Sequence, residues 1–152
     1  MRLLPNPRAM KKAIAAGLGG WFWITGLGAN GAEMSLYNPL PLSPNEEITD
    51  NLTAADIPTG EGGFARDYRV DLTAGDQVAI DLKSTEFDPL VVLMADDGST
   101  LGSNDDAPGG GTNSLLFARI PETGKYWVRV RTFGVSGGGQ FTLKLQRLFP
   151  AQ

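Results

Sequence analysis

Apolar and polar residues alternate along most of the chain between Phe64 and Leu148, and turns rich in Gly and Asp interrupt the alternation. In the segment ARDYRVDL, for example, Tyr68, Val70 and Leu72 fall on one side of an extended strand. A two-residue period is typical of half-buried strands, because successive side chains of a strand point to opposite faces. The pattern therefore predicts β-structure through this whole stretch, with no long helix.

The positions of the Gly- and Asp-rich turns predict seven or eight strands at a spacing of roughly 8–12 residues. A short first strand is expected at about 47–52, and the others at 65–72, 77–83, 89–95, 99–103, 114–120, 125–133 and 140–148. The run at 89–95 is nearly continuous in apolar residues, which predicts a strand covered on both sides. Asp96-Asp97-Gly98 is a hairpin-turn signal. The fold class that follows is all-β: an antiparallel two-sheet sandwich of jelly-roll type.

Residues 1–31 have the composition of a secretory signal peptide. They contain no acidic residue and four basic ones, Arg2, Arg8, Lys11 and Lys12. An apolar run from Ala13 to Ala29 follows and ends in small residues, which predicts cleavage near Gly31. An uncleaved membrane anchor is the less favoured alternative, because about 17 residues that include five glycines are marginal for crossing a bilayer. We expect an exported protein, periplasmic or extracellular, that has no membrane attachment after cleavage.

The remaining chain divides into two parts. Residues 32–63 are expected to form an extended arm with the first short strand, since three prolines fall within residues 33–44. Residues 64–149 are expected to form the sandwich domain. The chain has no Cys and no His, which excludes disulfides, zinc sites of the His/Cys type, and Ser-His-Asp or Cys-His catalysis. The domain must therefore be held together by its core.

The charge of the chain limits its partners. The chain has 13 basic and 17 acidic residues, and loss of the four leader cations leaves 9 against 17, a formal charge of −8. A surface of that sign repels phosphate backbones, so no nucleic-acid partner is expected. The same surface attracts cations.

Several segments together resemble the bacterial pre-peptidase C-terminal domain family. They are DYRVDLTAGDQVAIDL, EFDPLVVLMADDGSTLGSNDD, TNSLLF, TGKYWVRV and GQFTLKL, in that order, and the likeness covers residues 64–146. The resemblance implies a small non-catalytic β-sandwich of the kind appended to secreted enzymes. No catalytic domain accompanies it here, and the acidic calcium segment of the collagenase members has only a loose counterpart in Asn45-Glu46-Glu47 with Asp50-Asn51. Collagen binding is therefore not carried over.

An acidic loop supplies the first candidate site. Ca²⁺ binds six to eight oxygen atoms, and the loop offers side-chain oxygens from Asp88, Asn104, Asp105, Asp106 and Asn113. The structural alternative, which we favour modestly, is that these side chains cap backbone N–H groups in Asx-turns. Ca²⁺ is thus a candidate cofactor and none is certain. A weaker second cluster is formed by Glu46, Glu47, Asp50 and Asn51.

The strand at 125–133 supplies the second candidate site. If Tyr126, Val128 and Val130 face the core, the outward positions are Trp127, Arg129, Arg131 and Phe133. Trp and Arg are over-represented at binding hot spots, so this row predicts a docking face. The equally weighted alternative is self-stacking of Arg129 on Trp127 under the arm at 37–44, which would only seal the sheet.

Catalysis is not expected. Paired carboxylates such as Asp96/Asp97 or Asp105/Asp106 are the groups that a glycosidase uses, but neighbours on an exposed turn are normally solvated and nothing apolar adjoins them. We expect a monomeric accessory or binding module, either stabilised by calcium or binding through the Trp127 face without metal. Its partner would be a protein or a polysaccharide, for example a separately encoded secreted enzyme.

Overall fold

The computed structural model describes residues 37–109, 111–135 and 137–148. Within these ranges the chain is entirely β-structure and connecting loops. None of the described residues belongs to a helix that could span a membrane. The predicted signal peptide at 1–31 and its cleavage near Gly31 lie outside the described residues.

The described chain contains eight strands of five or more residues, in agreement with the predicted number, and two strands of two residues. In order they are β1 Leu40–Pro41, β2 Glu47–Leu52, β3 Ile57–Pro58, β4 Phe64–Leu72, β5 Gln77–Lys83, β6 Pro89–Ala95, β7 Thr100–Asn104, β8 Ser114–Arg119, β9 Gly124–Thr132 and β10 Gly139–Leu148. Each of the eight longer strands begins and ends within one residue of its expected position.

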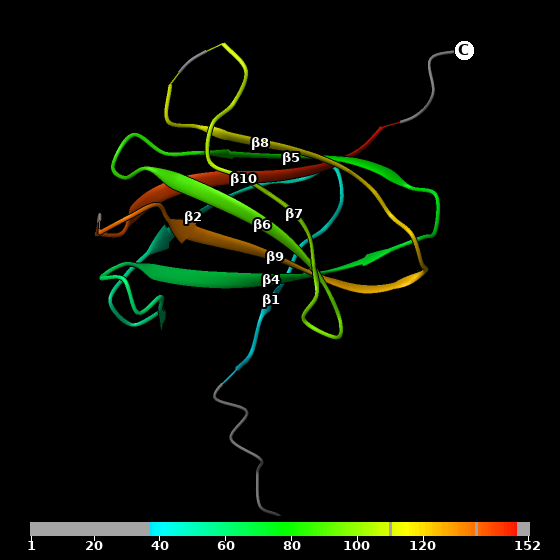
Figure 1. The fold of residues 1–152 in the computed structure, drawn as a ribbon, viewed down its shortest axis with the longest axis horizontal. Coiled ribbons are helices and arrows are strands. Elements are labelled where there is room, and N and C mark those ends of the chain that lie inside the picture. Colours follow the sequence, from blue (N-terminus) through cyan, green and yellow to red (C-terminus); the bar gives the residue numbers. More distant parts are fainter. Residues whose placement is uncertain (1–36, 110, 136, 149–152) are drawn as a thin grey trace, which may run out of the picture. The chain divides into compact units, whose positions relative to one another are not determined.

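The strands form two sheets that pack face to face, as the alternation predicts (Figure 1). Sheet A has the order β1-β4-β9-β6-β7, with β3 also paired to β4, and sheet B has the order β2-β10-β5-β8. All pairs are antiparallel except β1 with β4. The β6–β7 hairpin turns at Asp96-Asp97-Gly98 as expected, and Gly98 has a φ of 83°, a conformation that a residue with a Cβ adopts only at a cost.

The core lies between the sheets and is built from the alternate residues that the pattern assigned to it. Tyr68, Val70 and Leu72 of β4 are at most 2% exposed. Phe141 of β10 lies at the centre of an aromatic group, with edge-to-face contacts to Tyr68 and Phe87 at a centroid distance of 6.3 Å each. Such edge-to-face pairs stabilise a fold by about 0.5–1.5 kcal/mol more than burial of their apolar area alone.

Strand β6 differs from the expectation of burial on both sides. Pro89, Val91 and Leu93 are buried, whereas the alternate residues Leu90, Val92 and Met94 are only half-buried. A continuous apolar run indicates a strand with no polar face, but it does not show what covers that face. Here the outer side of β6 lies on the outer face of sheet A.

One charged residue interrupts the core face of β4. Arg66 lies on the same side as Tyr68, and its guanidinium bridges two carboxylates at the margin of the sandwich. Its Nη1 is 2.6 Å from Asp50 of β2 in sheet B, while Nε and Nη2 donate to Asp56 at 2.7 and 2.9 Å. The hydroxyl of Tyr68 donates to the second oxygen of Asp50 at 2.7 Å. This cluster, which we call the Arg66 clamp, ties the two sheets together.

The clamp shifts the ionisation of its members. Burial alone would raise the pKa of Asp50, but hydrogen bonds from Arg66, Tyr68 and the Asn51 N–H outweigh it, so the pKa of this carboxyl lies below its usual range. Burial and the hydrogen bond to Asp50 raise the pKa of Tyr68. A carboxyl with a depressed pKa contributes stability above its unfolded-state pKa, and that contribution is lost as the pH falls through the folded-state value.

We predict that Arg66→Met lowers the free energy of unfolding by about 1–3 kcal/mol, between the values for exposed and for buried ion pairs, because it leaves Asp50 and Asp56 without their cation. Urea denaturation at pH 7 measures the change. The matched control is Arg69→Met, an exposed arginine that points outward from the same strand. Equal losses in the two variants would show that Arg66 joins the sheets no better than a surface residue does.

A second prediction concerns the stability of the domain at low pH. The stability of the wild type should fall as the pH drops below about 4, the unfolded-state range of Asp, partly because Asp50 must then take up a proton. The Arg66→Met variant should show a shallower fall over the same pH range. Thermal melts between pH 2 and 7 test this, and parallel pH profiles would contradict it.

Candidate functional site

The two faces of β9 separate as the sequence predicts. Tyr126, Val128 and Val130 are 3%, 0% and 0% exposed. Trp127, Arg129 and Arg131 point to the other side and are half-buried, and Phe133, just beyond the strand, is 49% exposed. The predicted row therefore lies on the outer face of sheet A.

Arg129 is held by a carboxylate that the sequence analysis did not single out. Asp67 of β4 lies opposite Arg129 in the antiparallel register, and Nε and Nη2 of Arg129 donate to its two oxygens at 2.7 and 2.8 Å. The side chain of Asp67 is only 1% exposed. The hydrogen bonds to Asp67 raise the pKa of Arg129 against the opposing effect of burial. A bidentate pair of this kind fixes the guanidinium in one orientation.

The N-terminal arm covers the same ion pair. The hydroxyl of Tyr37 donates to Asp67, and its ring meets that of Trp127 edge-on at a centroid distance of 6.1 Å. Burial and the neighbouring Asp67 carboxylate raise the pKa of Tyr37 to about 12. The arm continues as β1, where the Leu42 N–H donates to the carbonyl of Arg69 at 2.8 Å. The predicted cover by the arm is thus present over Asp67 and the edge of Trp127, although Arg129 pairs with Asp67 instead of only stacking.

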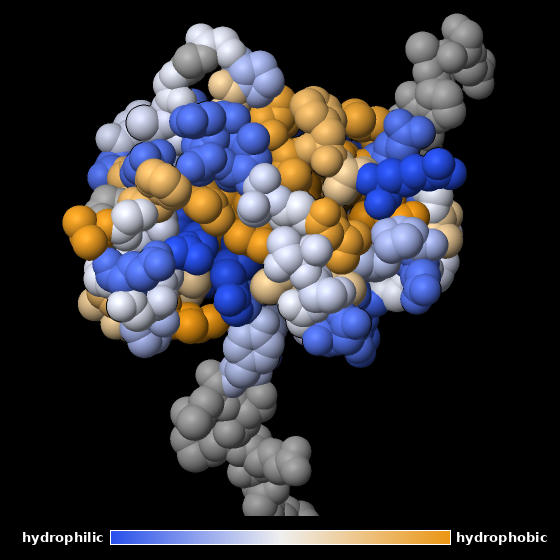
Figure 2. Space-filling view, viewed as in Figure 1, coloured by the Kyte–Doolittle hydropathy of each residue, from blue (hydrophilic) through white to orange (hydrophobic). Residues whose placement is uncertain are grey.

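An apolar row adjoins these residues. Met94, Val92 and Leu90 of β6 lie opposite Trp127, Arg129 and Arg131 in the β6–β9 register, and all three are half-buried. In the space-filling view hydrophobic and strongly hydrophilic side chains alternate across this face of sheet A (Figure 2). The outer face therefore combines an aliphatic row, an indole and fixed guanidinium groups.

Arg131 and Phe133 lie toward one end of this face. Nη2 of Arg131 donates to Glu61 in the β3–β4 loop at 2.9 Å, and both side chains of this pair remain accessible to solvent. The Phe133 N–H donates to the carbonyl of Asp88 at 2.7 Å. Arg131 can thus exchange its partner more readily than Arg129, whose carboxylate is buried.

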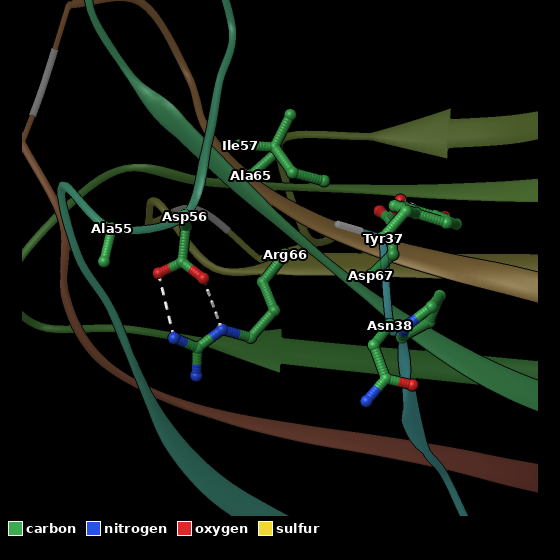
Figure 3. Close-up of a pocket in the computed structure, with 9 residues that line it drawn as sticks. Tyr37, Asn38, Ala55, Asp56, Ile57, Ala65, Arg66 and Asp67 are labelled. Atoms are coloured by element: carbon green, nitrogen blue, oxygen red, sulfur yellow. Dashed lines mark hydrogen bonds and ion pairs between the residues drawn. The ribbon is translucent and has the colours of Figure 1, made fainter. Parts of the chain in front are cut away.

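A small hollow lies beside this face, at the margin of β4 between β1 and β3. Figure 3 shows Tyr37 and Asn38 of the arm on one side, with Asp56 and Ile57 on the other. Its volume is about 170 Å³. The charged groups that line it, Arg66 with Asp56 and Asp67 with Tyr37, are already paired, so the hollow offers little for recognising a charged ligand.

The acidic loop brings together only part of the predicted calcium cluster. Burial raises the pKa of Asp88, and the charges of Asp106 and Asp105 raise it further, so Asp88 lies within electrostatic range of both. The Oδ1 atom of Asp88 is buried and has no hydrogen-bond partner among the described residues. The amide oxygens of Asn104 and Asn113 instead accept backbone N–H groups, from Leu115 at 3.4 Å and from Ser84 at 3.2 Å.

The two asparagines thus accept N–H groups from residues distant in sequence and not from local Asx-turns, and Oδ1 of Asp88 makes no such contact. The described residues contain no group of three or more acidic side chains in an arrangement that could hold a metal ion by itself. In the weaker cluster around Glu46 and Glu47, Asp50 belongs to the Arg66 clamp, and Asn51 donates its own N–H to Asp50 at 2.7 Å. Within that cluster, the Asp50 carboxylate is thus committed to structural contacts.

The chain can be compared with known proteins in sequence and in structure. No curated protein matches the chain in sequence. Among solved structures, the pre-peptidase C-terminal domain of a collagenase from Bacillus anthracis is similar at 14% identity and a TM-score of 0.53, covering 71% of this chain and 94% of its own. PliG of Aeromonas hydrophila, a periplasmic inhibitor of g-type lysozyme, is similar at 14% identity and a TM-score of 0.54, with the same coverage. At these identities the two structures support the fold alone.

The family model of the bacterial pre-peptidase C-terminal domain matches residues 65–132. The match extends from β4 to the end of β9 and so includes Asp67, Asp88, the acidic loop, and Trp127, Arg129 and Arg131. The resemblance read from the sequence is confirmed: residues 65–132 of this chain match the bacterial pre-peptidase C-terminal domain.

Proposed function

We propose that this chain is an exported, non-catalytic accessory module that binds a protein partner through the outer face of sheet A. The family supports an accessory role. The observation that carries the proposal is the combination at β9 and β6: Trp127 is half-buried and held edge-on by Tyr37, and the aliphatic row of β6 lies beside it. A hydrolytic activity of the purified chain that disappears on substitution of one carboxylate would overturn the non-catalytic part.

The composition of the face favours a protein over a polysaccharide. Sugar-binding sites depend on an open aromatic surface with polar groups around it, whereas Trp127 is flanked by Met94 and by the ring of Tyr37. Indole, aliphatic and guanidinium groups in one patch are the composition of protein-binding hot spots. PliG, a domain of the same fold, is itself described as an inhibitor of another protein, which agrees with such a use.

The roles of the residues follow from their contacts. Trp127 would supply the buried anchor, and Arg131, whose pair with Glu61 is exposed, would supply a charge that can turn to the partner. Arg129 acts as a positioning residue, because both of its contacts go to the buried Asp67. Phe133 would extend the apolar contact beyond the end of β9.

We predict that a photo-crosslinking amino acid at position 127 captures an exported protein in the organism that makes the chain. The same group at Lys144, on the outer side of sheet B, should not capture it. Addition of Arg131→Glu should reduce the yield at least about ten-fold, the effect expected for a hot-spot charge. Capture of the same species from both positions, or recognition of oligosaccharides on an array that is lost with Trp127→Ala, would refute the protein partner.

A second candidate function is calcium-dependent stabilisation of the acidic loop. It is favoured by one observation, the buried and unpartnered Oδ1 of Asp88 near two further carboxylates. A divalent cation would relieve both the repulsion and the desolvation. Asp88 would contribute carboxylate oxygens together with Asp105 or Asp106, while Asn104 and Asn113 keep their contacts with backbone N–H groups, so backbone carbonyls and water would complete the coordination.

We predict that millimolar CaCl₂ raises the melting temperature by several degrees relative to EDTA, because an ion that binds only the folded state stabilises it by mass action. Mg²⁺ at the same concentration should have a smaller effect. Asp88→Asn should abolish the rise, whereas Asp71→Asn, an exposed carboxylate on β4, should retain it. An equal rise in Asp88→Asn and in the wild type would exclude this site.

The raised pKa of Asp88 adds a further expectation without metal. An acid whose folded-state pKa is raised binds more protons when folded, so its ionised form destabilises the fold at neutral pH and this penalty is relieved as the pH falls. In EDTA at pH 7, Asp88→Asn should therefore melt above the wild type. A lower melting temperature would mean that the ionised Asp88 makes a favourable contact.

A further inference from the structure

The two sheets have four edges, and three of them carry features that oppose pairing with another strand. At one side of sheet A, β1 is only two residues long and includes Pro41. At the other side, β7 is interrupted by a register shift opposite Leu93/Met94. In sheet B, β2 turns the charged Asp50 inward. Short strands, prolines, bulges and inward charges are the usual protection of β-edges.

The fourth edge, β8, has none of these features. Its six residues, SLLFAR, include no Pro or Gly, and Arg119 at the end is its sole charge. It lies at the margin of sheet B, paired only with β5 (Figure 1). Phe117 on its outward face is 61% exposed, and hydrophobic side chains gather along this margin in the space-filling view (Figure 2).

The direction of the backbone groups of β8 follows from two hydrogen bonds. The Ile120 N–H donates to the Asp76 carbonyl on the β5 side at 2.8 Å. The Leu115 N–H donates away from β5, to the side chain of Asn104, at 3.4 Å. Because backbone groups alternate along a strand of an antiparallel sheet, the N–H and C=O of Phe117 and Arg119 also point away from β5. The open part of the edge thus runs from Phe117 to Arg119.

We propose that β8 pairs antiparallel with β8 of a second copy of this chain, with Phe117 opposite Phe117 of the second copy. In this register the two Phe117 residues exchange N–H···O=C bonds. The Arg119 N–H of each copy donates to the Leu115 carbonyl of the other, and the contact of the Leu115 N–H with Asn104 is retained. The result is one continuous sheet across a two-fold axis, a self-complementary contact of the isologous type.

Side chains and charge support a second copy as the occupant. The pairing covers two exposed phenylalanines with one another, and a hollow of about 380 Å³ lined by Val78, Ala118 and Leu148 adjoins Phe117. The loop between β7 and β8, which contains Asp105 and Asp106, extends beside the first residues of β8 (Figure 1). An antiparallel neighbour brings its Arg119, which makes no ion pair with a described residue, toward these carboxylates. A parallel neighbour would instead place arginine beside arginine.

This inference is independent of the proposed partner face, because β8 and the Trp127 row belong to different sheets. The sequence leads to the expectation of a monomer, and the edge of β8 favours a pair instead. The contact is small, so we expect a reversible dimer in equilibrium with the monomer.

The test is site-specific cross-linking, since the chain contains no Cys. Residues opposite one another in a hydrogen-bonded antiparallel pair have Cα atoms about 5.5 Å apart, within the range of about 4.4–6.8 Å for a disulfide. Under mild oxidation of the purified chain, Phe117→Cys should form a disulfide-linked dimer at least about ten-fold faster than Val135→Cys. Val135 is 83% exposed and lies outside β8, so the oxidation rate of its variant measures dimer formation by random collision.

Sedimentation equilibrium of the chain without engineered cysteines gives the second readout. The wild type should show a concentration-dependent mass between one and two chains, and Phe117→Lys should weaken association at least about ten-fold by placing two cations together. A wild type that stays monomeric at millimolar concentration, or equal oxidation rates for the two cysteine variants, would overturn the proposal. Binding of an unrelated extended peptide by a monomeric chain would also overturn it, since the edge would then have another occupant.

Discussion

The alternation of β4 directs two consecutive charged residues to opposite faces of sheet A, and much of the structure depends on that geometry. Arg66 points inward and joins Asp50 of sheet B to Asp56. Asp67 points outward and holds both Arg129 and the arm residue Tyr37. In a domain without disulfides, these two clusters replace covalent links: one fixes the sheets to each other, and the other fixes the arm to the sheet.

The ion pairs also determine how charge is distributed over the domain. Four of the arginines in the described residues, Arg66, Arg129, Arg131 and Arg147, have carboxylate partners within 3.1 Å. These arginines neutralise carboxylates on and beside the sheets, whereas Asp105 and Asp106 form no ion pair with a described residue and raise the pKa of Asp88 through their charges. The negative surplus of the sequence is thus concentrated where loops meet, and the outer face of sheet A is closer to neutral than the composition suggests.

Strand positions could be predicted from the sequence because the signals for each strand are local: apolar and polar residues alternate within it, and Gly and Asp residues occupy the turns between strands. The outward row of Trp127, Arg129 and Arg131 follows from the same alternation. The partner of Arg129 does not, since Asp67 and Arg129 are far apart in sequence and meet only through the β4–β9 register. Alternation gives the face of a residue but not its neighbouring strand.

The other shortfalls have similar causes. Arg66 occupies a core position, where a pattern of apolar residues gives no reason to expect a charge. The sequence places several oxygen donors in the acidic loop, but composition could not separate the two asparagines that accept N–H groups from Asp88, whose buried oxygen has no partner among the described residues. That distinction depends on burial of single atoms, which only the folded chain reveals.

The place of β10 has a consequence for how the chain acquires its structure. The last strand lies between β2 and β5 in sheet B, and it pairs Gly139 with Leu52 and Lys144 with Glu47. Sheet B therefore cannot be completed before residues 139–148 have been synthesised, and contacts of such long sequence separation form slowly. A nascent chain that has not reached these residues therefore leaves β2 without its neighbour in sheet B, although β4, β6, β7 and β9 of sheet A are already present.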